Sequence, residues 1–503
     1  MMKMTIMNTI IKYLTIIIFA GTVFSCNEDT FLEHEFVNSV VDDNFLTQPS
    51  HADEAVIGMY DVVGYQGLWK WDRIMLGSSA ADEVAEDHND PGWPHLVNID
   101  NYRWFPENVR IWEHWVDNYI GIKMANAIID KVPIIEDMEV NLSERYVAEA
   151  KCLRAMFYYN LVTAHGDVPL ILEELSPAKA REITRTPETE VWAQIIKDLT
   201  EAEAILPDAY PSDTDAGRVT RGTANTMLSK VYLWQKDYDN AASAALEVIN
   251  SPAGYDLEPE YADLFNGVSE HSKERIFAVN CAADIGGSMW GRKIDEGNRN
   301  YLWGPYFRWS WFIQPDRGYI DFNDHRVDTM TLDMRNGETY DKNNDGIIDT
   351  VSADAIPASP PHDAHIMKQV PVNDNLNDGK VWQGGLNYVD ILVLRYSEVL
   401  LNYAEALVES GQSAQALPYL NQVRTRANLS DITTTDANEL RDIILNERKL
   451  EFCFEGKRFF DLKRVGRLEE FLGPLGFKAG RHENFPIPQS EIDITQMKQN
   501  TGY

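Results

Sequence analysis

Two segments of this chain share one internal spacing, which restricts the chain to folds built from paired helices. They are ANTMLSKVYLWQKDYDNAASAALEVI at residues 224–249 and VLLNYAEALVESGQSAQALPYLNQV at residues 399–423. Leu228 precedes Ala241 by thirteen positions, and Leu401 precedes Ala414 by the same interval. Each segment predicts two short amphipathic helices joined by a polar turn. Because alanine at facing positions lets helices approach closely, the pattern is typical of tetratricopeptide-like helical pairs.

The rest of the chain divides into helical stretches and one irregular region. Apolar residues at three- and four-residue intervals predict further helices at residues 144–164, 190–206 and 439–452. Residues 286–385 are instead rich in Gly, Pro, Asn, Asp and aromatic residues, and short strands are predicted at 275–280 and 389–394. Long irregular regions of helical proteins commonly carry function. We therefore expect a mostly α-helical scaffold that carries large loops and a few short strands.

The N-terminus predicts a lipoprotein leader. The apolar run at residues 14–24 is too short to span a bilayer, but it has the length and positively charged upstream flank of a signal peptide. Ser25 and Cys26 end this run in a pattern that resembles a bacterial lipobox, in which the cysteine is acylated and becomes the mature N-terminus. We predict a signal peptide at residues 1–25 and a palmitate-type anchor on Cys26. The alternative is an ordinary secretory signal with a chance cysteine.

Composition excludes several classes of partner. The formal net charge is −34, so the chain lacks the basic face that nucleic acid requires and is repelled by anionic membrane surfaces. A hydrophobic fraction of 44% indicates a globular rather than a disordered chain. Beyond Cys26 the chain has Cys152, Cys281 and Cys453, which lie in apolar stretches without CxxC spacing. They predict buried thiols rather than a disulfide framework or a zinc site.

Several blocks, in order along the chain, resemble the SusD/RagB family. They are AKCLRAMFYYNLVTAHGDVPLILEE from residue 150, RTPETEVWAQIIKDLTEAEAILP from 185, GRVTRGTANTMLSKVYLW from 217, NERKLEFCFEGKRFFDLKRVGR from 446, FPIPQSEID from 485 and KQNTGY from 498. The resemblance covers the mature chain, residues 26–503. Within it, 26–235 corresponds to an N-terminal SusD-like helical region, and 236–503 to a loop-rich ligand region with a C-terminal SusD/RagB region.

The resemblance implies a fold, a location and a function. It implies a SusD-like fold on tetratricopeptide-like pairs, in a lipid-anchored protein on the outer face of the outer membrane. It implies non-catalytic binding of oligo- or polysaccharide for carbohydrate uptake, with a SusC-type TonB-dependent transporter as the partner. In such proteins the helical repeats face the transporter and the loop-rich side tends to hold the ligand. Some members bind other nutrients.

The family-like blocks contain aromatic and charged side chains that we expect to be scaffold rather than a binding patch. Aromatic residues dominate protein cores, and an Asp–Arg pair can close a turn. These residues are Arg458, Phe459, Phe460, Asp461 and Arg464, together with Trp115, Tyr119 and Asn126.

The strongest ligand candidate is the aromatic run NYLWGPYFRWSWF at residues 300–312. Pyranose rings expose an apolar face that a flat indole matches, and polar side chains can then bond the ring hydroxyls. The predicted glycan-binding residues of this run are Asn300, Tyr301, Trp303, Arg308, Trp309 and Trp311. A local hydrophobic mini-core is the alternative, because ligand sites and cores are both mostly apolar.

A second ligand candidate is EVAEDHNDPGWPHL at residues 83–96. Trp93 lies between Gly92 and Pro94, which indicates a rigid turn rather than a helix face. Asp87 and His88 precede it and are of the types that bond sugar hydroxyls. We predict all three as glycan contacts, with a tucked-in Trp93 as the alternative.

A third signal is DKNNDGIIDTVS at residues 341–352, which resembles a calcium-binding turn. Asp341, Asn343, Asp345 and Asp349 occupy positions 1, 3, 5 and 9, and the Ile347 carbonyl occupies position 7. Position 12 is a serine where a bidentate glutamate is expected, and a solvated acidic turn is the alternative. We predict a structural Ca²⁺ here, and no cofactor required for function.

An enzymatic function is the rival interpretation. A surface glycoside hydrolase needs two carboxylates across the scissile bond. With 79 acidic residues, adjacent carboxylates such as Asp82, Glu83, Glu86 and Asp87 are uninformative. The chain has no nucleophile elbow, P-loop or dinucleotide glycine motif. We therefore predict a glycan-binding protein that is not an enzyme; a hydrolase and a peptide-binding or assembly lipoprotein are the alternatives.

The calcium site gives a direct prediction. Treating the mature protein with EDTA should lower its melting temperature, because removal of a bound ion withdraws its stabilisation of the folded state. Asp345→Asn should reduce the response to EDTA. A melting temperature that is the same with EDTA and with added Ca²⁺ would rule out the site.

Overall fold

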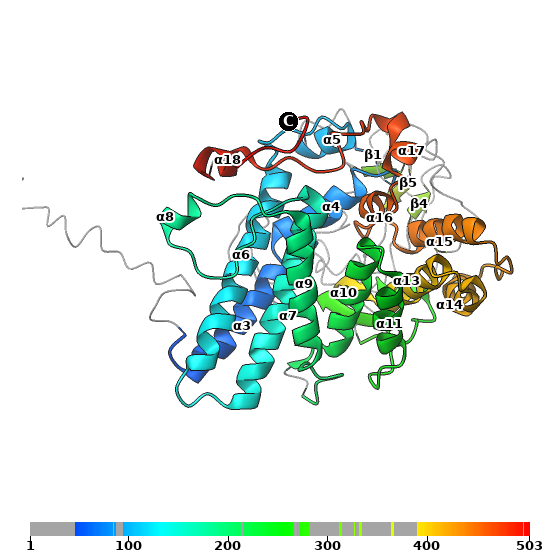
Figure 1. Cartoon of the computed structure of the whole chain (residues 1–503). Helices are drawn as coiled ribbons and strands as arrows, with labels where there is room; N and C mark the ends of the chain where they lie inside the picture. The colour runs from blue at the N-terminus through cyan, green and yellow to red at the C-terminus, as the bar shows by residue number, and fades with distance from the viewer. Residues whose placement is uncertain are drawn as a thin grey trace, which may run out of the picture. The chain divides into compact units, whose positions relative to one another are not determined.

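The computed structural model describes residues 46–83, 85–86, 94–212, 215–265, 269, 271–280, 311–313, 326, 331–333, 364–366, 390–495 and 497–503. These residues belong to one compact unit that is mostly helical (Figure 1). The predicted leader and Cys26 lie outside them. No helix in the described part of the chain is both long and apolar enough to cross a bilayer.

Helices before the irregular region run from residue 49 to residue 264. They are α3 (Pro49–Val63), the π-helix η1 (Gln66–Lys70), α4 (Asp72–Ser78), α5 (Pro94–Asp100), α6 (Val109–Lys131), the 3₁₀ turn η2 (Val132–Ile134), α7 (Val140–His165), α8 (Pro177–Ala180), α9 (Glu188–Glu203), α10 (Arg221–Trp234), α11 (Tyr238–Ile249) and the 3₁₀ turn η4 (Tyr261–Leu264). The predicted helices at 144–164 and 190–206 are confirmed as α7 and α9.

Helices after the irregular region complete the scaffold. They are α13 (Tyr396–Glu409), α14 (Ser413–Arg426), α15 (Ala437–Glu451), α16 (Arg458–Arg464), α17 (Leu468–Leu472), the 3₁₀ turn η10 (Gly473–Leu475) and α18 (Gln489–Thr495). Side chains fix where several helices begin: the Asp436 carboxylate accepts hydrogen bonds from the backbone N–H groups of Asn438 and Glu439 at the start of α15. Consecutive helices pack side by side from α6 through α7, α9, α10, α11 and α13 to α14 (Figure 1).

Both predicted helical pairs are confirmed, as α10–α11 and α13–α14. They stack on each other, because Leu233 of α10, Ala241 of α11 and Ala406 of α13 form one buried cluster. A hydrogen bond of 2.9 Å from Asn402 Nδ2 to Ser229 Oγ also joins α13 to α10. The pairs therefore bury their small residues against each other, as the spacing predicts.

The predicted role of Ala414 is wrong. Ala241 is the fourth residue of α11 and is buried, whereas Ala414 is the second residue of α14 and is exposed. The reason is the position of the leucine: α10 and α13 both have 14 residues, but Leu228 is the eighth residue of α10 and Leu401 is the sixth of α13. The residue thirteen positions after the leucine is therefore the second residue of α14 instead of the fourth. The alanine at the fourth position of α14, Ala416, is the buried one.

Two small antiparallel sheets lie beside the helices. Strand β2 (Arg275–Val279) pairs with β6 (Ile391–Arg395), which confirms both predicted strands. The second sheet has the order β1-β3-β5-β4, with β1 at Ala85–Glu86, β3 at Trp311–Ile313, β4 at Thr331–Asp333 and β5 at Ala364–Ile366. The sequence did not predict this second sheet, because strands of two or three residues are too short to display alternation.

Close backbone contact joins α4 to the C-terminal region. A Cβ on Gly77 would lie 1.9 Å from the Gly456 carbonyl oxygen, and a Cβ on Gly456 would lie 2.5 Å from Ile74 Cα. Gly456 also has a φ of +68°, which favours glycine. These glycines allow the N-terminal helix α4 to rest directly against the turn that precedes α16.

Buried thiols and imidazoles lie in the core. Cys152 and Cys453 are buried free thiols, as predicted, and Cys281 lies outside the described residues. His114 of α6 and His165 of α7 are fully buried, with 3.4 Å between His114 Nδ1 and His165 Nε2. Burial lowers the pKa of His165 to about 3, and burial together with His165 and Arg73 lowers the pKa of His114 well below its ordinary value.

This histidine pair predicts acid sensitivity. Between the ordinary histidine pKa of 6.5 and about 3, the unfolded chain binds protons at His165 that the folded chain does not. The free energy of unfolding should therefore fall as the pH drops below 6.5, by up to about 1.4 kcal/mol per pH unit for each histidine. Denaturant unfolding measured from pH 7 to pH 4 tests this.

The matched variants are His165→Gln and His51→Gln, since His51 lies on α3 and is not fully buried. His165→Gln should flatten the dependence of unfolding free energy on pH, whereas His51→Gln should leave it unchanged. Equal slopes in the two variants would show that the buried pair does not control acid stability.

Candidate functional site

The two aromatic segments predicted as ligand contacts meet in one sheet. Strand β1 comes from residues 83–96 and strand β3 from residues 300–312, and they pair with Ala85 opposite Phe312 and Glu86 opposite Trp311. These strands are more than two hundred residues apart in the sequence. Only tertiary structure could therefore bring them together.

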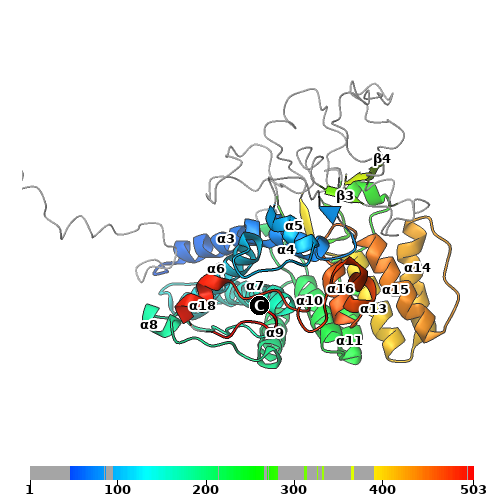
Figure 2. The same cartoon turned by 90° about the horizontal axis from the view of Figure 1, so that it is seen from above.

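The direction of this pairing fixes where the chain leaves β1 and where it enters β3. Because β1 and β3 are antiparallel, the chain leaves β1 after Glu86 at the end where it enters β3 at Trp311. Asp87 directly follows one strand, and Trp309 lies two residues before the other. Strand β5 pairs with β3 on its other side, with His365 opposite Phe312. Figure 2 shows β3 and β4 on the side of the helices where α4 and α5 lie.

Most of the predicted site residues lie outside the described part of the chain. Trp311 is the first residue of β3. The remaining predicted glycan contacts all lie outside the described residues: Asp87, His88, Trp93, Asn300, Tyr301, Trp303, Arg308 and Trp309. The predicted calcium ligands Asp341, Asn343, Asp345, Ile347 and Asp349 also lie outside it. Their roles stay predictions.

The chain entering the first segment is anchored to the C-terminal region. Arg458 Nε and Nη2 donate to the two carboxylate oxygens of Asp82 at 2.8 and 3.1 Å. The carboxylate of Glu83, next in the chain, accepts a hydrogen bond of 3.3 Å from the Phe454 backbone N–H. All of these side chains are buried, so the pairing is shielded from solvent. These two carboxylates therefore serve the scaffold rather than acid–base chemistry.

The chain leaving the first segment is also held in place. Asn108 Nδ2 donates to the His95 carbonyl at 3.0 Å, and the Tyr102 hydroxyl donates to the Ala80 carbonyl at 2.6 Å. Trp104 stacks on Phe485, with 4.2 Å between the ring centres. The protein therefore fixes both ends of residues 84–93 on buried groups.

The second segment belongs to a long insertion closed by strands β2 and β6. Arg275 pairs with Arg395 and Val279 with Ile391, so residues 280–390 leave and return at neighbouring positions. Asp390 Oδ2 accepts a hydrogen bond of 2.5 Å from Arg275 Nη1 across this junction. The insertion that carries β3, β4 and β5 is thereby joined to the helices at a defined place.

Arg326 anchors the insertion a second time. Its Nη1 donates to Glu447 Oε1 at 2.7 Å and to Glu451 Oε2 at 3.0 Å. All three side chains are at most 1% exposed. Sequence reasoning missed Arg326, although Glu447 and Glu451 lie one turn apart in the family-like block and so present two carboxylates on one helix face.

The Arg326 partners belong to a larger buried network centred on Arg395. Arg395 donates to Glu274 at 2.8 Å and to Glu455 at 2.8 and 3.1 Å, and it also bonds Glu451. Burial alone would raise the pKa of Glu451, but Arg426, Arg395 and Arg326 hold it well below its ordinary value. Glu451 is therefore ionised, and it joins three arginines from separate parts of the chain.

The family-like blocks are scaffold, as predicted. Asp461 accepts hydrogen bonds from Arg448 at 2.9 Å and from Arg464 at 3.3 Å, inside the core. The Tyr119 hydroxyl donates to the Pro169 carbonyl at 2.9 Å, and Asn126 Nδ2 donates to the Ile171 carbonyl at 3.0 Å. The buried members of the predicted scaffold set are Trp115, Asn126, Arg458, Phe459, Phe460 and Asp461.

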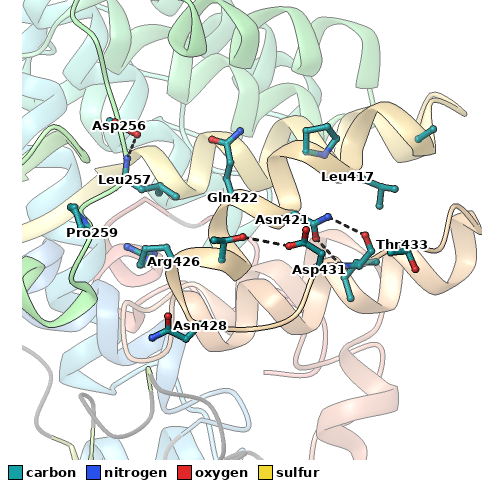
Figure 3. A pocket seen from close by; sticks show the side chains of 14 residues that line it. Asp256, Leu257, Pro259, Leu417, Asn421, Gln422, Arg426, Asn428, Asp431 and Thr433 are labelled. Atoms are coloured by element: carbon teal, nitrogen blue, oxygen red, sulfur yellow. Dashed lines mark hydrogen bonds between the residues drawn. The ribbon is translucent and has the colours of Figure 1, made fainter.

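A separate hollow of about 920 Å³ lies along α14 and the loops around Asp256 and Asp431 (Figure 3). Asn421 bonds the Ile432 backbone through both its amide nitrogen and its amide oxygen, at 3.0 and 2.8 Å. None of the residues described as lining this hollow is aromatic, so it lacks a flat face for a sugar ring. It is a weaker glycan candidate than the β1–β3 sheet.

The described residues give no support for a metal centre, since none of their His, Cys, Asp and Glu side chains gather in a group of three that could hold an ion. The predicted calcium turn lies outside this description.

Two family models match the chain. A model described as SusD family matches residues 203–484, and one described as starch-binding associating with outer membrane matches residues 30–233. Among curated proteins, SusD-like protein P2 of Formosa agariphila is 30% identical over 98% of this chain and 100% of that protein.

Solved structures of the same kind superpose well on the chain. A laminarin-binding SusD-like protein matches with a TM-score of 0.77 and 29% identity, over 91% of this chain and 100% of that one. Surface glycan-binding protein A from Bacteroides thetaiotaomicron in complex with laminarihexaose matches with a TM-score of 0.72 and 23% identity, over 90% of this chain and all of that one. The second likeness shows the fold alone.

The Arg326 contacts predict a large effect of one substitution in the insertion. Arg326→Met should lower the free energy of unfolding by about 3–5 kcal/mol, because it leaves two buried carboxylates short of a counter-charge. Arg441→Met is the matched control: Arg441 pairs with Glu409 on the surface, and its loss should cost less than about 1 kcal/mol. Urea denaturation measures both, and equal values for the two variants would contradict the anchoring role of Arg326.

Proposed function

Because this chain belongs to the SusD family of non-catalytic, outer-membrane-associated glycan-binding proteins, we propose that it captures a polysaccharide at the cell surface and delivers it to a SusC-type TonB-dependent transporter. We propose laminarin as the glycan, since a laminarin-binding relative is 29% identical over 91% of this chain. The observation that carries the proposal is the pairing of β1 with β3, which joins the two segments predicted as ligand contacts.

The chemistry of these segments suits a sugar chain. Trp93, Trp303 and Trp309 offer flat apolar faces against which pyranose rings can stack. Asp87, His88, Asn300, Tyr301 and Arg308 supply hydrogen-bond donors and acceptors for the hydroxyls at the ring edges. Trp311 begins β3. Stacking provides affinity for the ring, and the polar residues select its substitution pattern.

The structure also explains why binding rather than hydrolysis is expected of these segments. A glycoside hydrolase needs a free carboxylic acid and a second carboxylate across the bond. Asp82 is held by two hydrogen bonds from Arg458, and Glu83 by the Phe454 backbone. Both acids at the base of the first segment are therefore occupied by scaffold contacts.

Laminarin binding is the direct test. The mature protein should be retarded in a native gel that contains laminarin, and it should release no reducing sugar. Trp93→Ala and Trp303→Ala should each weaken binding by about 1–3 kcal/mol, the scale of removing an aromatic face from the contact, with the melting temperature retained.

Tyr419→Ala is the control for loss of an aromatic side chain, because Tyr419 lies on α14, outside both segments. It should bind laminarin as the unmodified protein does. Collapse of the melting temperature in both tryptophan variants would show that these rings form a core. Retardation by a different polysaccharide alone would refute laminarin but keep the binding function.

We further propose that acylated Cys26 anchors the protein to the outer membrane beside its transporter. Cys26→Ala should appear in the soluble fraction, because the acyl chains supply the membrane affinity. The unmodified protein should stay with the outer membrane, and a SusC-type transporter should co-purify with it in mild detergent. Membrane retention of Cys26→Ala would refute the lipid anchor, and absence of the transporter from the purified complex would refute the partnership.

A further inference from the structure

A partly enclosed cavity of about 40 Å³ lies where α4, α7, α10, α13, α15 and α16 meet. None of the lining residues that the structure describes belongs to residues 83–96 or 300–312. Cationic side chains dominate its wall: Arg73, Lys230, Arg448, Lys457 and Arg464 line it, against only two carboxylates. The excess of positive charge inside the protein requires an explanation, because buried charges are costly unless they are paired.

Four of the five cations have carboxylate partners. Glu398 accepts hydrogen bonds of 2.7 Å from both Lys230 and Lys457. Arg448 bonds Asp461 at 2.9 Å. Arg464, the fourth, bonds Asp461 at 3.3 Å and Glu405 at 2.9 Å. Glu398 and Asp461, the two carboxylates of the wall, each pair with two cations already. They therefore cannot neutralise the fifth cation.

Arg73 is the exception. Its side chain is buried, with the residue 7% exposed, and it lies over the Phe460 ring at 3.6 Å from the ring centre. Its one hydrogen bond is a long contact of 3.5 Å from Nη2 to Thr163 Oγ1, and Nη1 has no partner in the described part of the chain. No carboxylate of a described residue forms an ion pair with it, and burial lowers its pKa to about 10, at which it is still charged at neutral pH.

We propose that this cavity binds a small monovalent anion of the size of chloride, which supplies the counter-charge of Arg73. By volume the cavity holds about three water molecules or one such anion. Water can satisfy N–H groups but cannot neutralise a guanidinium. Larger anions such as sulfated or carboxylated sugars exceed the space, so the site is separate from glycan capture.

The cavity offers hydrogen-bond donors of the right kind. Tyr159 lines it, and burial raises the pKa of its hydroxyl, so the hydroxyl keeps its proton and can donate to an anion. The ammonium group of Lys230 lies 5.6 Å from the centre of the Tyr159 ring, at the same wall. Guanidinium, ammonium and hydroxyl donors from separate helices thus converge on one space.

Binding here has a structural consequence for the glycan-binding side. Arg73 belongs to α4, and Phe460 to α16. Helix α16 also carries Arg458, which holds Asp82 at the entry to the first ligand segment. An anion beside Arg73 therefore stabilises the contact between α4 and α16 on which that segment rests.

Thermal unfolding of the mature protein in chloride and in gluconate tests the proposal. At constant ionic strength, replacing sodium gluconate by sodium chloride should raise the melting temperature saturably, by about 2–5 °C, and bromide should act as chloride does. Arg73→Met should lose the chloride response, and Arg441→Met, which removes a surface arginine, should keep it. Identical melting of the unmodified protein in both salts would overturn the proposal.

Crystals of the unmodified protein grown with sodium bromide give a second measurement that does not depend on a variant that folds. An anomalous bromide peak beside the Arg73 guanidinium, inside the cavity, is the expected result. Water density in the cavity with bromide only at the surface would overturn the proposal, even if chloride raised the melting temperature.

Discussion

Burial of charge is the constraint on which this structure depends. Glu451 accepts hydrogen bonds from Arg326, Arg395 and Arg426, three arginines that come from the insertion, from the end of β6 and from α14. A carboxylate this deep is stable only with counter-charges around it, and each guanidinium in turn needs its carboxylates. Loss of one member leaves the others unpaired. Such a network can therefore form in only one arrangement of the chain segments that supply it. Apolar packing alone is compatible with several arrangements.

Similar pairing joins other segments that are distant in sequence. Arg154 of α7 donates to both carboxylate oxygens of Asp198 on α9 at 2.8 Å, and to Asn126 of α6 at 2.8 Å. Arg458 holds Asp82 across most of the length of the chain. The family-like blocks supply Arg154, Asp198 and Arg458 to these contacts. Their role is to fix the scaffold, and the ligand segments extend from it.

A fixed scaffold with ligand segments that extend from it suits a binding protein. The helices form the base, the first ligand segment begins and ends beside buried, paired groups, and Arg326 joins the insertion that carries β3 to α15. Sequence between those anchors can change without disturbing the base, which is how one fold can present surfaces for different glycans. The Arg73 cavity departs from the rule of paired charges, and the proposed anion would restore it.

The sequence by itself determined the family, the helical pairs and the scaffold role of the family-like blocks, and it predicts the leader, because local periodicity and motif spacing are found in consecutive residues. It also singled out the residue types able to hold a sugar. Tertiary structure alone decided the rest. The two-residue difference in where Leu228 and Leu401 lie within their helices placed Ala416, rather than Ala414, in the core. Strands of two or three residues pair segments that are more than two hundred positions apart. Arg326 donates hydrogen bonds to carboxylates on α15. Long-range pairing of this kind leaves no local pattern, since its energy comes from desolvated partners that meet only in the folded chain.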